Sequence, residues 1–102
     1  MYYFIGIKGS GMASLARILY DLGYEVAGSD IDKYIFLEDG LRERHIPIYS
    51  FNKDNIKDGM DVIVGNAFDR SNEEVAAAED NPNVTIHHYY DFLAKLMDDH
   101  IL

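Results

Sequence analysis

Short apolar runs alternate with helix-like patterns along the whole chain, and this alternation limits the folds that are open to it. Each run is rich in β-branched or aromatic residues and is short enough to be a buried strand. The runs are Tyr2–Ile7, Tyr24–Ser29, Ile46–Tyr49, Met60–Gly65 and Val84–His87. Strands separated by helices form βαβ units, and such units build a parallel sheet with right-handed crossovers.

Helical signals fill the segments between these runs and the end of the chain. The expected helices are Met12–Leu22, Lys33–Arg44, Ser71–Asp80 and a last one around Phe92–Met97. Asp32 is the expected cap of the second helix, whose Phe36, Leu37 and Leu41 should face inward. Ser71 is the expected cap of the third. The sequence therefore predicts one α/β domain over residues 1–102, a Rossmann-like fold with a parallel five-stranded sheet and helices on both faces.

Composition excludes several classes of function. The formal net charge is −9, from 18 acidic and 9 basic side chains, and nucleic-acid binding needs a basic surface that this balance does not provide. Without cysteine the chain has no disulfide framework and no thiolate metal site. No apolar run approaches the roughly 20 residues of a membrane helix, and no secretory pattern precedes the first strand. We expect a cytoplasmic domain with no membrane partner.

The loop Gly6–Gly11 follows the first predicted strand and opens the first predicted helix. Its sequence, Gly-Ile-Lys-Gly-Ser-Gly, frees the backbone around Ser10 to point N–H groups at an anion, with the helix dipole behind them. We interpret it as a phosphate-binding loop; the alternative is a βα turn whose glycines serve geometry alone. Lys8 replaces the glycine that lets the backbone approach the pyrophosphate in dinucleotide folds. It predicts a mobile positive charge beside a diphosphate, or else a solvated side chain.

Parallel sheets bind ligands at the carboxyl ends of their strands, so the residues after the other strands are also candidates. Asp30 lies 19 residues beyond Gly11 (30 − 11), where dinucleotide folds place an acidic residue that accepts hydrogen bonds from ribose; it is otherwise a loop carboxylate or cap. Asn66 can offer a donor and an acceptor to a base or sugar, or close a turn on its own backbone. Ala67 leaves room for a ring. His87–Tyr90 follow the last predicted strand and are a further place for a ligand. The eight tyrosines of the chain are interpreted as core and rim residues and not as a stacking platform, because the chain is acidic.

Metal binding and catalysis find no support in the motifs. His87 and His88 are adjacent, so on a strand they point to opposite faces, while His45 and His100 are isolated. Zinc needs three or four convergent ligands, so we expect no metal site. The chain also has no nucleophile elbow and no Walker A sequence, and we expect no catalytic residue in it.

Together these residues resemble the N-terminal domain of the Mur ligases. FIGIKGSGMASLARILYDLGYEVAGSD resembles the first βαβ unit of that family, VIVGNAF its fourth strand and following loop, and SNEEV the start of the next helix. HHYYDFLAKLM is similar to the segment that leads out of the domain. The resemblance covers nearly all 102 residues and is greatest to the members that join L-alanine to UDP-N-acetylmuramic acid.

The resemblance implies a domain that binds the UDP portion of UDP-N-acetylmuramic acid in peptidoglycan biosynthesis. The implied contacts are Lys8, Gly9, Ser10, Gly11, Met12, Ser29, Asp30, Ile31, Asn66, Ala67 and Phe68. The complete ligase would use ATP and Mg²⁺ to form an acyl phosphate, which an amine then attacks. Its Gly-Thr-His-Gly-Lys-Thr P-loop would follow Leu102, and neither the ATPase domain nor the C-terminal domain is present. This predicts a ligase fragment that binds nucleotide without catalysing.

Two other classes of protein remain open. One is an NAD-binding domain of a dehydrogenase or a regulatory sensor, which the fold favours and Lys8 disfavours. The other is a non-catalytic interaction domain with a vestigial loop.

Overall fold

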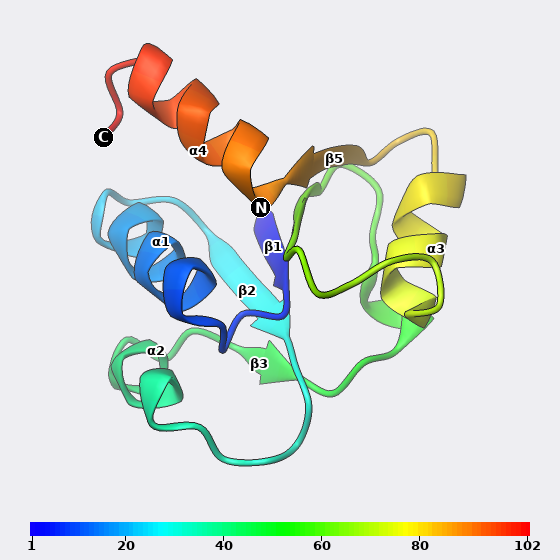
Figure 1. Cartoon of the computed structure of the whole chain (residues 1–102), viewed down its shortest axis with the longest axis horizontal. Helices are drawn as coiled ribbons and strands as arrows, with labels where there is room; N and C mark the ends of the chain where they lie inside the picture. Colours follow the sequence, from blue (N-terminus) through cyan, green and yellow to red (C-terminus); the bar gives the residue numbers. More distant parts are fainter.

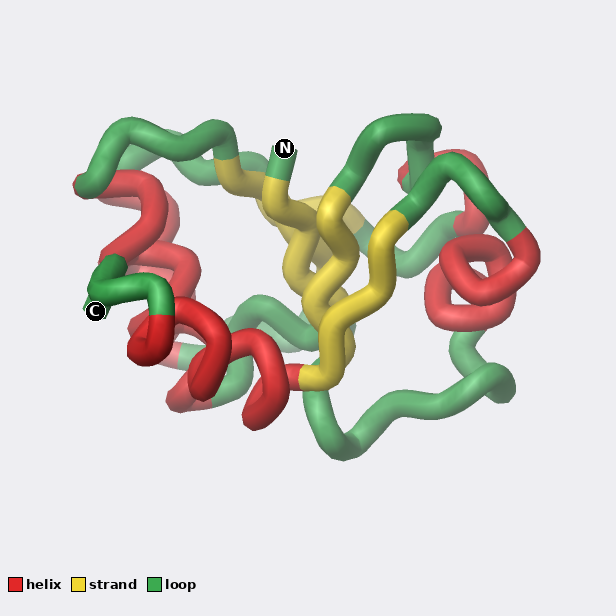
Figure 2. The backbone as a smooth tube through the Cα atoms, turned by 90° about the horizontal axis from the view of Figure 1, so that it is seen from above, coloured by secondary structure: helices red, strands yellow, loops and turns green.

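The structure is a computed structural model that describes all residues from 1 to 102. A five-stranded parallel sheet lies between two layers of helices (Figures 1 and 2). The strands are β1 (Tyr2–Ile5), β2 (Val26–Ser29), β3 (Ile48–Tyr49), β4 (Asp61–Val64) and β5 (Thr85–His88). Their order is β3-β2-β1-β4-β5. The chain therefore builds the sheet from β1 toward β3, crosses back, and continues from β4 to β5 on the other side of β1. The predicted Rossmann-like fold is confirmed.

Helices cover the two faces of the sheet unequally. One face carries α1 (Ser10–Asp21), α2 (Asp39–Glu43) and α4 (Tyr89–Asp98), whereas α3 (Glu73–Asp80) covers the other (Figure 2). The chain also has two short 3₁₀ turns: η1 (Phe36–Glu38) directly precedes α2, and η2 (Lys53–Asn55) lies between β3 and β4. No helix has the length and apolar character that crossing a membrane requires.

The core has two parts because successive side chains of a strand point to opposite faces. Phe4 of β1 belongs to the larger cluster, which includes Leu15 and Leu19 of α1 and Phe92 of α4. Tyr3 and its same-face neighbours form the smaller cluster. Its members are Tyr3, Ile5, Ala27, Ile56, Val62, Val64, Val75 and Ala78.

The second predicted helix differs most from the structure. Residues 31–35 form no helix, and only η1 and the short α2 follow. The carboxylate of Glu38 accepts a hydrogen bond from the Ile35 N–H at 2.9 Å, which starts the helical turn at residue 36. Phe36, predicted to face inward, is 71% exposed. The expected cap Asp32 instead accepts a hydrogen bond from the hydroxyl of Ser50.

The cap of α3 also differs from the prediction by one position. Asn72, not Ser71, precedes the first helical residue. Its side-chain oxygen accepts hydrogen bonds from the N–H groups of Glu74 and Val75 at 2.8 and 3.3 Å. Both residue types cap well, so the sequence alone does not choose between them.

Candidate functional site

The glycine loop runs from the end of β1 to the start of α1 and is bonded to the neighbouring strand. Gly6 has a φ of 86°, a left-handed conformation that glycine adopts without steric cost. The N–H groups of Gly6 and Ile7 donate to the Ser29 carbonyl at 2.9 and 3.0 Å. A side chain at Gly6 would also meet the ring of Phe68 at 2.3 Å. The loop is therefore a rigid turn whose position is set by β2 and by Phe68.

The first turn of α1 keeps its N–H groups free. Those of Ser10, Gly11 and Met12 donate to no backbone oxygen, and the capping residue Gly9 has no side chain to accept them. These groups are the positive end of a helix of 12 residues. A helix start of this kind favours an anion, which can accept several of the N–H groups at once.

A pocket of about 330 Å³ opens beside these N–H groups. We call it the glycine-loop pocket. Its lining combines the glycine loop, the end of β4 and the start of α4: Gly9, Ser10, Gly11, Met12, Gly65, Asn66, Tyr89, Tyr90 and Leu93. None of these side chains is charged, so an anion there meets no carboxylate at contact distance despite the acidity of the chain.

Tyr89 lies directly over the start of α1. A methyl group added to Gly11 would be 2.5 Å from its hydroxyl oxygen, so only glycine leaves room for the tyrosine. The Tyr89 hydroxyl forms no hydrogen bond within the protein and lines the pocket. The pocket thus holds a free hydroxyl donor beside the free N–H groups of α1.

Asp30 joins the end of β2 to the glycine loop. Its Oδ2 accepts a hydrogen bond from the Lys8 N–H at 2.8 Å, and its Oδ1 accepts one from the Ile31 N–H at 2.7 Å. The residue is 8% exposed. Each carboxylate oxygen keeps a second lone pair, so Asp30 orders the loop and can still accept a hydrogen bond from a ligand.

The side chain of Lys8 is buried, which contradicts both expectations drawn from the sequence. The residue is 3% exposed, so its ammonium is neither a mobile charge beside the loop nor solvated. Nζ donates to the carbonyls of Ile31 and Lys33 at 2.9 Å each, and lies 3.4 Å from Oε1 of Glu38. An ammonium has three N–H donors, and three oxygens account for them.

A second, smaller pocket lies at the end of β2, on the other side of the glycine loop. We call it the β2-end pocket; its volume is about 80 Å³. It is lined by Lys8, Asp30, Ile31, Asp32, Arg42, Ile48, Tyr49 and Ser50. Arg42 uses its Nε to bond Glu38 at 2.7 Å, which leaves the ends of its guanidinium without a protein acceptor at the mouth of this pocket.

Glu38 is charged although it is buried. Burial opposes the charged form, but the N–H of Ile35, the guanidinium of Arg42 and the ammonium of Lys8 outweigh it, so the pKa of Glu38 lies below its ordinary value. The side chain is 3% exposed. A buried carboxylate with a cation on each side is an ionic centre that holds separate segments together.

The structure separates the predicted site residues into groups. Gly9–Met12 and Asn66 line the glycine-loop pocket, whereas Lys8, Asp30 and Ile31 line the β2-end pocket. Ser29 is fully buried, and its hydroxyl donates to Glu74 on the face of the sheet that α3 covers, which we call the far face. Phe68 packs on Phe51, with ring centroids 5.5 Å apart, on that same face. Ala67 is exposed and lines neither pocket.

Sequence reasoning missed the α4 side of the glycine-loop pocket. Tyr89, Tyr90 and Leu93 all line it. The rule that ligands bind after the carboxyl ends of strands does point to residues 87–90. The acidic charge of the chain favours the interpretation of its tyrosines as core and rim residues, and a tyrosine carries no motif that marks it as a ligand contact.

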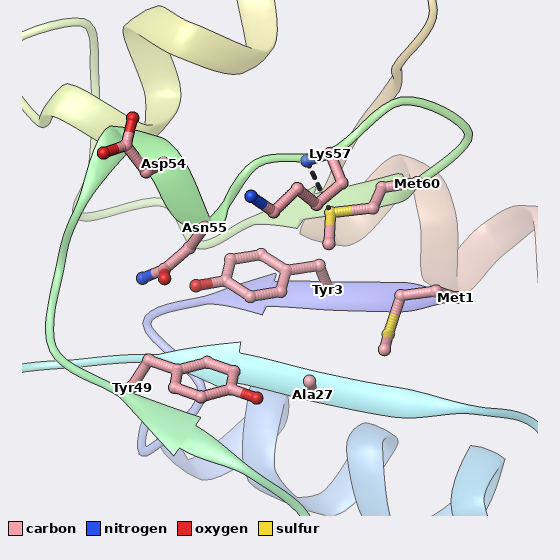
Figure 3. Close-up of a pocket in the computed structure, with 8 residues that line it drawn as sticks. All are labelled: Met1, Tyr3, Ala27, Tyr49, Asp54, Asn55, Lys57 and Met60. Carbon is pink, nitrogen blue, oxygen red and sulfur yellow. Dashed lines mark hydrogen bonds between the residues drawn. The ribbon is translucent and has the colours of Figure 1, made fainter.

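A third pocket, of about 300 Å³, lies on the far face of the sheet (Figure 3). Its lining includes Ala27 and the ring of Tyr49 on one side of the Tyr3 ring and Lys57 on the other side. Burial raises the pKa of Tyr3, and its hydroxyl donates to the buried Glu74 at 2.8 Å. This pocket has no part of the glycine loop and lies away from the carboxyl ends of β1 and β4.

Comparison with known proteins shows the family of the chain. Residues 1–101 match the model of a protein family described as "Mur ligase family, catalytic domain". The chain belongs to the Mur ligase family. No group of three or more His, Asp or Glu side chains in this Mur ligase domain is placed to hold a metal ion.

Two solved structures of Mur ligases share the fold. UDP-N-acetylmuramate–alanine ligase from Thermotoga maritima superposes with a TM-score of 0.85 and 27% identity, over 96% of this chain and 23% of that one. UDP-N-acetylmuramate:L-alanyl-γ-D-glutamyl-meso-diaminopimelate ligase from Neisseria meningitides gives 0.76 and 28%, over 92% and 30%. The present chain thus spans less than a third of the length of either ligase.

Proposed function

We propose that this chain is the N-terminal nucleotide-binding domain of a UDP-N-acetylmuramate–L-alanine ligase of peptidoglycan biosynthesis. Its task is to hold the UDP portion of UDP-N-acetylmuramic acid. Membership of the Mur ligase family and the likeness to the Thermotoga maritima ligase support the proposal. The single observation that carries it is the row of free N–H groups at Ser10, Gly11 and Met12, which opens into the glycine-loop pocket.

A diphosphate suits the glycine-loop pocket chemically. Phosphate oxygens accept several N–H bonds at once, and the helix dipole favours their charge. The hydroxyls of Ser10 and Tyr89 and the amide of Asn66 add side-chain donors without adding a fixed charge. Because no lysine or arginine lines this pocket, backbone and neutral donors would supply most of the binding.

The nucleoside would lie toward the β2-end pocket. Asp30 is available there to accept a ribose hydroxyl, and the exposed Ile31 offers an apolar surface to the base. The two pockets lie on either side of the glycine loop. A nucleoside diphosphate can therefore extend from one pocket to the other, with the sugar of the substrate directed toward Asn66.

Ligation itself would need groups that these 102 residues do not supply. The glycine loop lacks the Lys-Ser/Thr pair of a Walker A sequence, and no acidic cluster is placed to hold Mg²⁺. ATP and Mg²⁺ would act elsewhere in a complete ligase. We therefore propose that this chain binds nucleotide and does not catalyse.

Isothermal titration calorimetry with UDP and NAD tests the proposal. We expect UDP to bind with an affinity near millimolar, about −4 kcal/mol, because much of the substrate would contact other domains. We expect no heat from NAD at the same concentration. Tight NAD binding without a response to UDP would overturn the proposal in favour of a dinucleotide-binding domain.

A further inference from the structure

Residues 31–35, which lead from Asp30 to η1, have no regular secondary structure, yet they are held by hydrogen bonds from residues outside the segment. The ammonium of Lys8 bonds its carbonyls at Ile31 and Lys33, both at 2.9 Å. These bonds replace the ladder that a helix or strand would have provided. The backbone of the segment thus takes its position from a side chain of the glycine loop.

Glu38 fixes the other end of the same segment. Its Oε1 accepts the Ile35 N–H at 2.9 Å and lies 3.4 Å from the Lys8 ammonium. Its Oε2 bonds Arg42 at 2.7 Å. Lys8 and Glu38 are each 3% exposed at the side chain, so solvent screens their interaction little.

Both the backbone and the side chain of Lys8 form hydrogen bonds to residues that follow β2. Its backbone N–H is bonded to Asp30, which places the residue within the glycine loop, while its ammonium holds residues 31–35. A buried ion pair is weak evidence for stability, because an apolar pair of similar volume often serves as well. What the pair at this place supplies is a fixed geometry between two segments that face different pockets.

We propose that Lys8 and Glu38 are positioning residues, which fix the nucleoside-facing segment 31–35 relative to the diphosphate-binding glycine loop. The inference rests on the proposed function. A ligand that touches both segments benefits because its binding site is ordered in advance, whereas a ligand that touches the loop alone does not. UDP is a ligand of the first kind and inorganic pyrophosphate is one of the second.

Three variants separate positioning from stability. Glu38→Gln removes the carboxylate and leaves the buried Lys8 ammonium without a counter-charge. Lys8→Met removes the ammonium and leaves the Glu38 carboxylate with Arg42 as its only cation. The double variant Lys8→Met/Glu38→Gln leaves neither charge, so its melting temperature should recover part of the loss. The matched control is Asp21→Asn. Asp21 is the last residue of α1, at the end away from the glycine loop, and the change removes its exposed ion pair with Arg44.

Calorimetry of each variant with UDP and with pyrophosphate gives the affinities. For Glu38→Gln we expect the affinity for UDP to fall by about tenfold. A change of this size corresponds to the free energy of one hydrogen bond to a charged group. Pyrophosphate binding should change by less than about twofold, as should UDP binding to Asp21→Asn. The double variant should stay as weak for UDP as Glu38→Gln although it is more stable.

Hydrogen exchange of the ligand-free protein tests the bracing independently of any ligand. Amides of residues 31–35 should exchange at least about tenfold faster in Glu38→Gln, with the core strands unchanged. Unchanged exchange in this segment would overturn the inference. So would equal losses of UDP and pyrophosphate affinity, or recovery of UDP affinity in the double variant. If the unmodified protein binds no UDP, the proposed function fails, and the exchange rates still decide whether Lys8 and Glu38 hold the segment.

Discussion

The backbone N–H of Lys8 lies 2.8 Å from Oδ2 of Asp30, across 22 positions of sequence. This bond joins the glycine loop to the end of β2, and the same carboxylate also receives the Ile31 N–H. The acidic residue that dinucleotide folds use for ribose therefore serves first as a bridge within the protein. Any nucleoside at the end of β2 shares Asp30 with the loop that would hold its phosphates.

Replacing Asp30 should reduce both stability and binding. Asp30→Ala leaves the N–H groups of Lys8 and Ile31 without acceptors, so we expect a loss of about 1.5–3 kcal/mol in the free energy of unfolding. Urea denaturation measures it, and UDP affinity should fall in the same variant. Asp98→Ala, a change at an exposed aspartate at the end of α4 that lines neither pocket, is the control. Unchanged stability in Asp30→Ala would show that the bridge does not order the loop.

Two glycine substitutions should have opposite outcomes. In Gly28→Ala the new methyl lies 2.5 Å from the Phe4 carbonyl oxygen and 2.7 Å from Ile7, so we expect a destabilisation of about 3 kcal/mol or more. In Gly11→Ala the three atoms nearest the new methyl all belong to the end of the Tyr89 side chain, which can rotate away. That variant should melt near the normal temperature but bind UDP more weakly, because Tyr89 leaves its place over α1. Differential scanning calorimetry with titration of UDP distinguishes the two; similar melting temperatures would contradict the packing described for Gly28.

The free hydroxyl of Tyr89 should contribute to binding and not to folding. Tyr89→Phe removes one donor from the glycine-loop pocket, and we expect UDP affinity to fall by roughly threefold to tenfold. The melting temperature should stay the same because the hydroxyl has no partner within the protein. Tyr90→Phe removes a hydroxyl from the adjacent, 66% exposed ring and should change UDP affinity less. A larger effect at Tyr90 than at Tyr89 would place the ligand elsewhere in the pocket.

The ion pair of Glu38 should make stability depend on pH in the acid range. The pKa of Glu38 in the folded protein lies below its ordinary value of 4.5. Its contribution is therefore fully present above about pH 4.5 and is lost as the pH falls through the folded-state pKa. The difference in unfolding free energy between the unmodified protein and Glu38→Gln should therefore decrease as the pH is lowered through this range. Urea denaturation at several pH values measures this, and a constant difference would contradict the assignment.

The sequence predicts the sheet well and the polar contacts poorly, for physical reasons. Buried parallel strands such as β4 consist of continuous apolar runs, and these are visible in any window of the chain. The Lys8–Glu38 pair joins residues 30 positions apart (38 − 8), and isolated lysine and glutamate residues are normally solvated. Their burial depends on the tertiary fold, which brings β1, β2 and η1 together.

Phe36 and Tyr89 show that the positions of aromatic side chains also depend on the tertiary fold and are not predicted from the sequence. Helical spacing predicts that Phe36 faces inward, but Glu38 starts the turn at residue 36 and leaves that ring 71% exposed. Tyr89 belongs to the site because α4 begins beside the glycine loop and Gly11 leaves room for the ring. The glycine pattern alone predicts the loop and its free N–H groups, because its three glycines follow a strand and open a helix.

The proposed function requires that the free N–H groups at the start of α1 bind the diphosphate of a uridine nucleotide. Titration of ¹⁵N-labelled protein with UDP, followed by two-dimensional NMR, tests it most directly. We predict that the amide signals of Ser10, Gly11 and Met12 move most, together with that of Asn66, and that uridine without phosphate leaves the first three in place. If UDP shifts none of these amides, or mainly those around the far-face pocket of Tyr3 and Tyr49, the claim is contradicted.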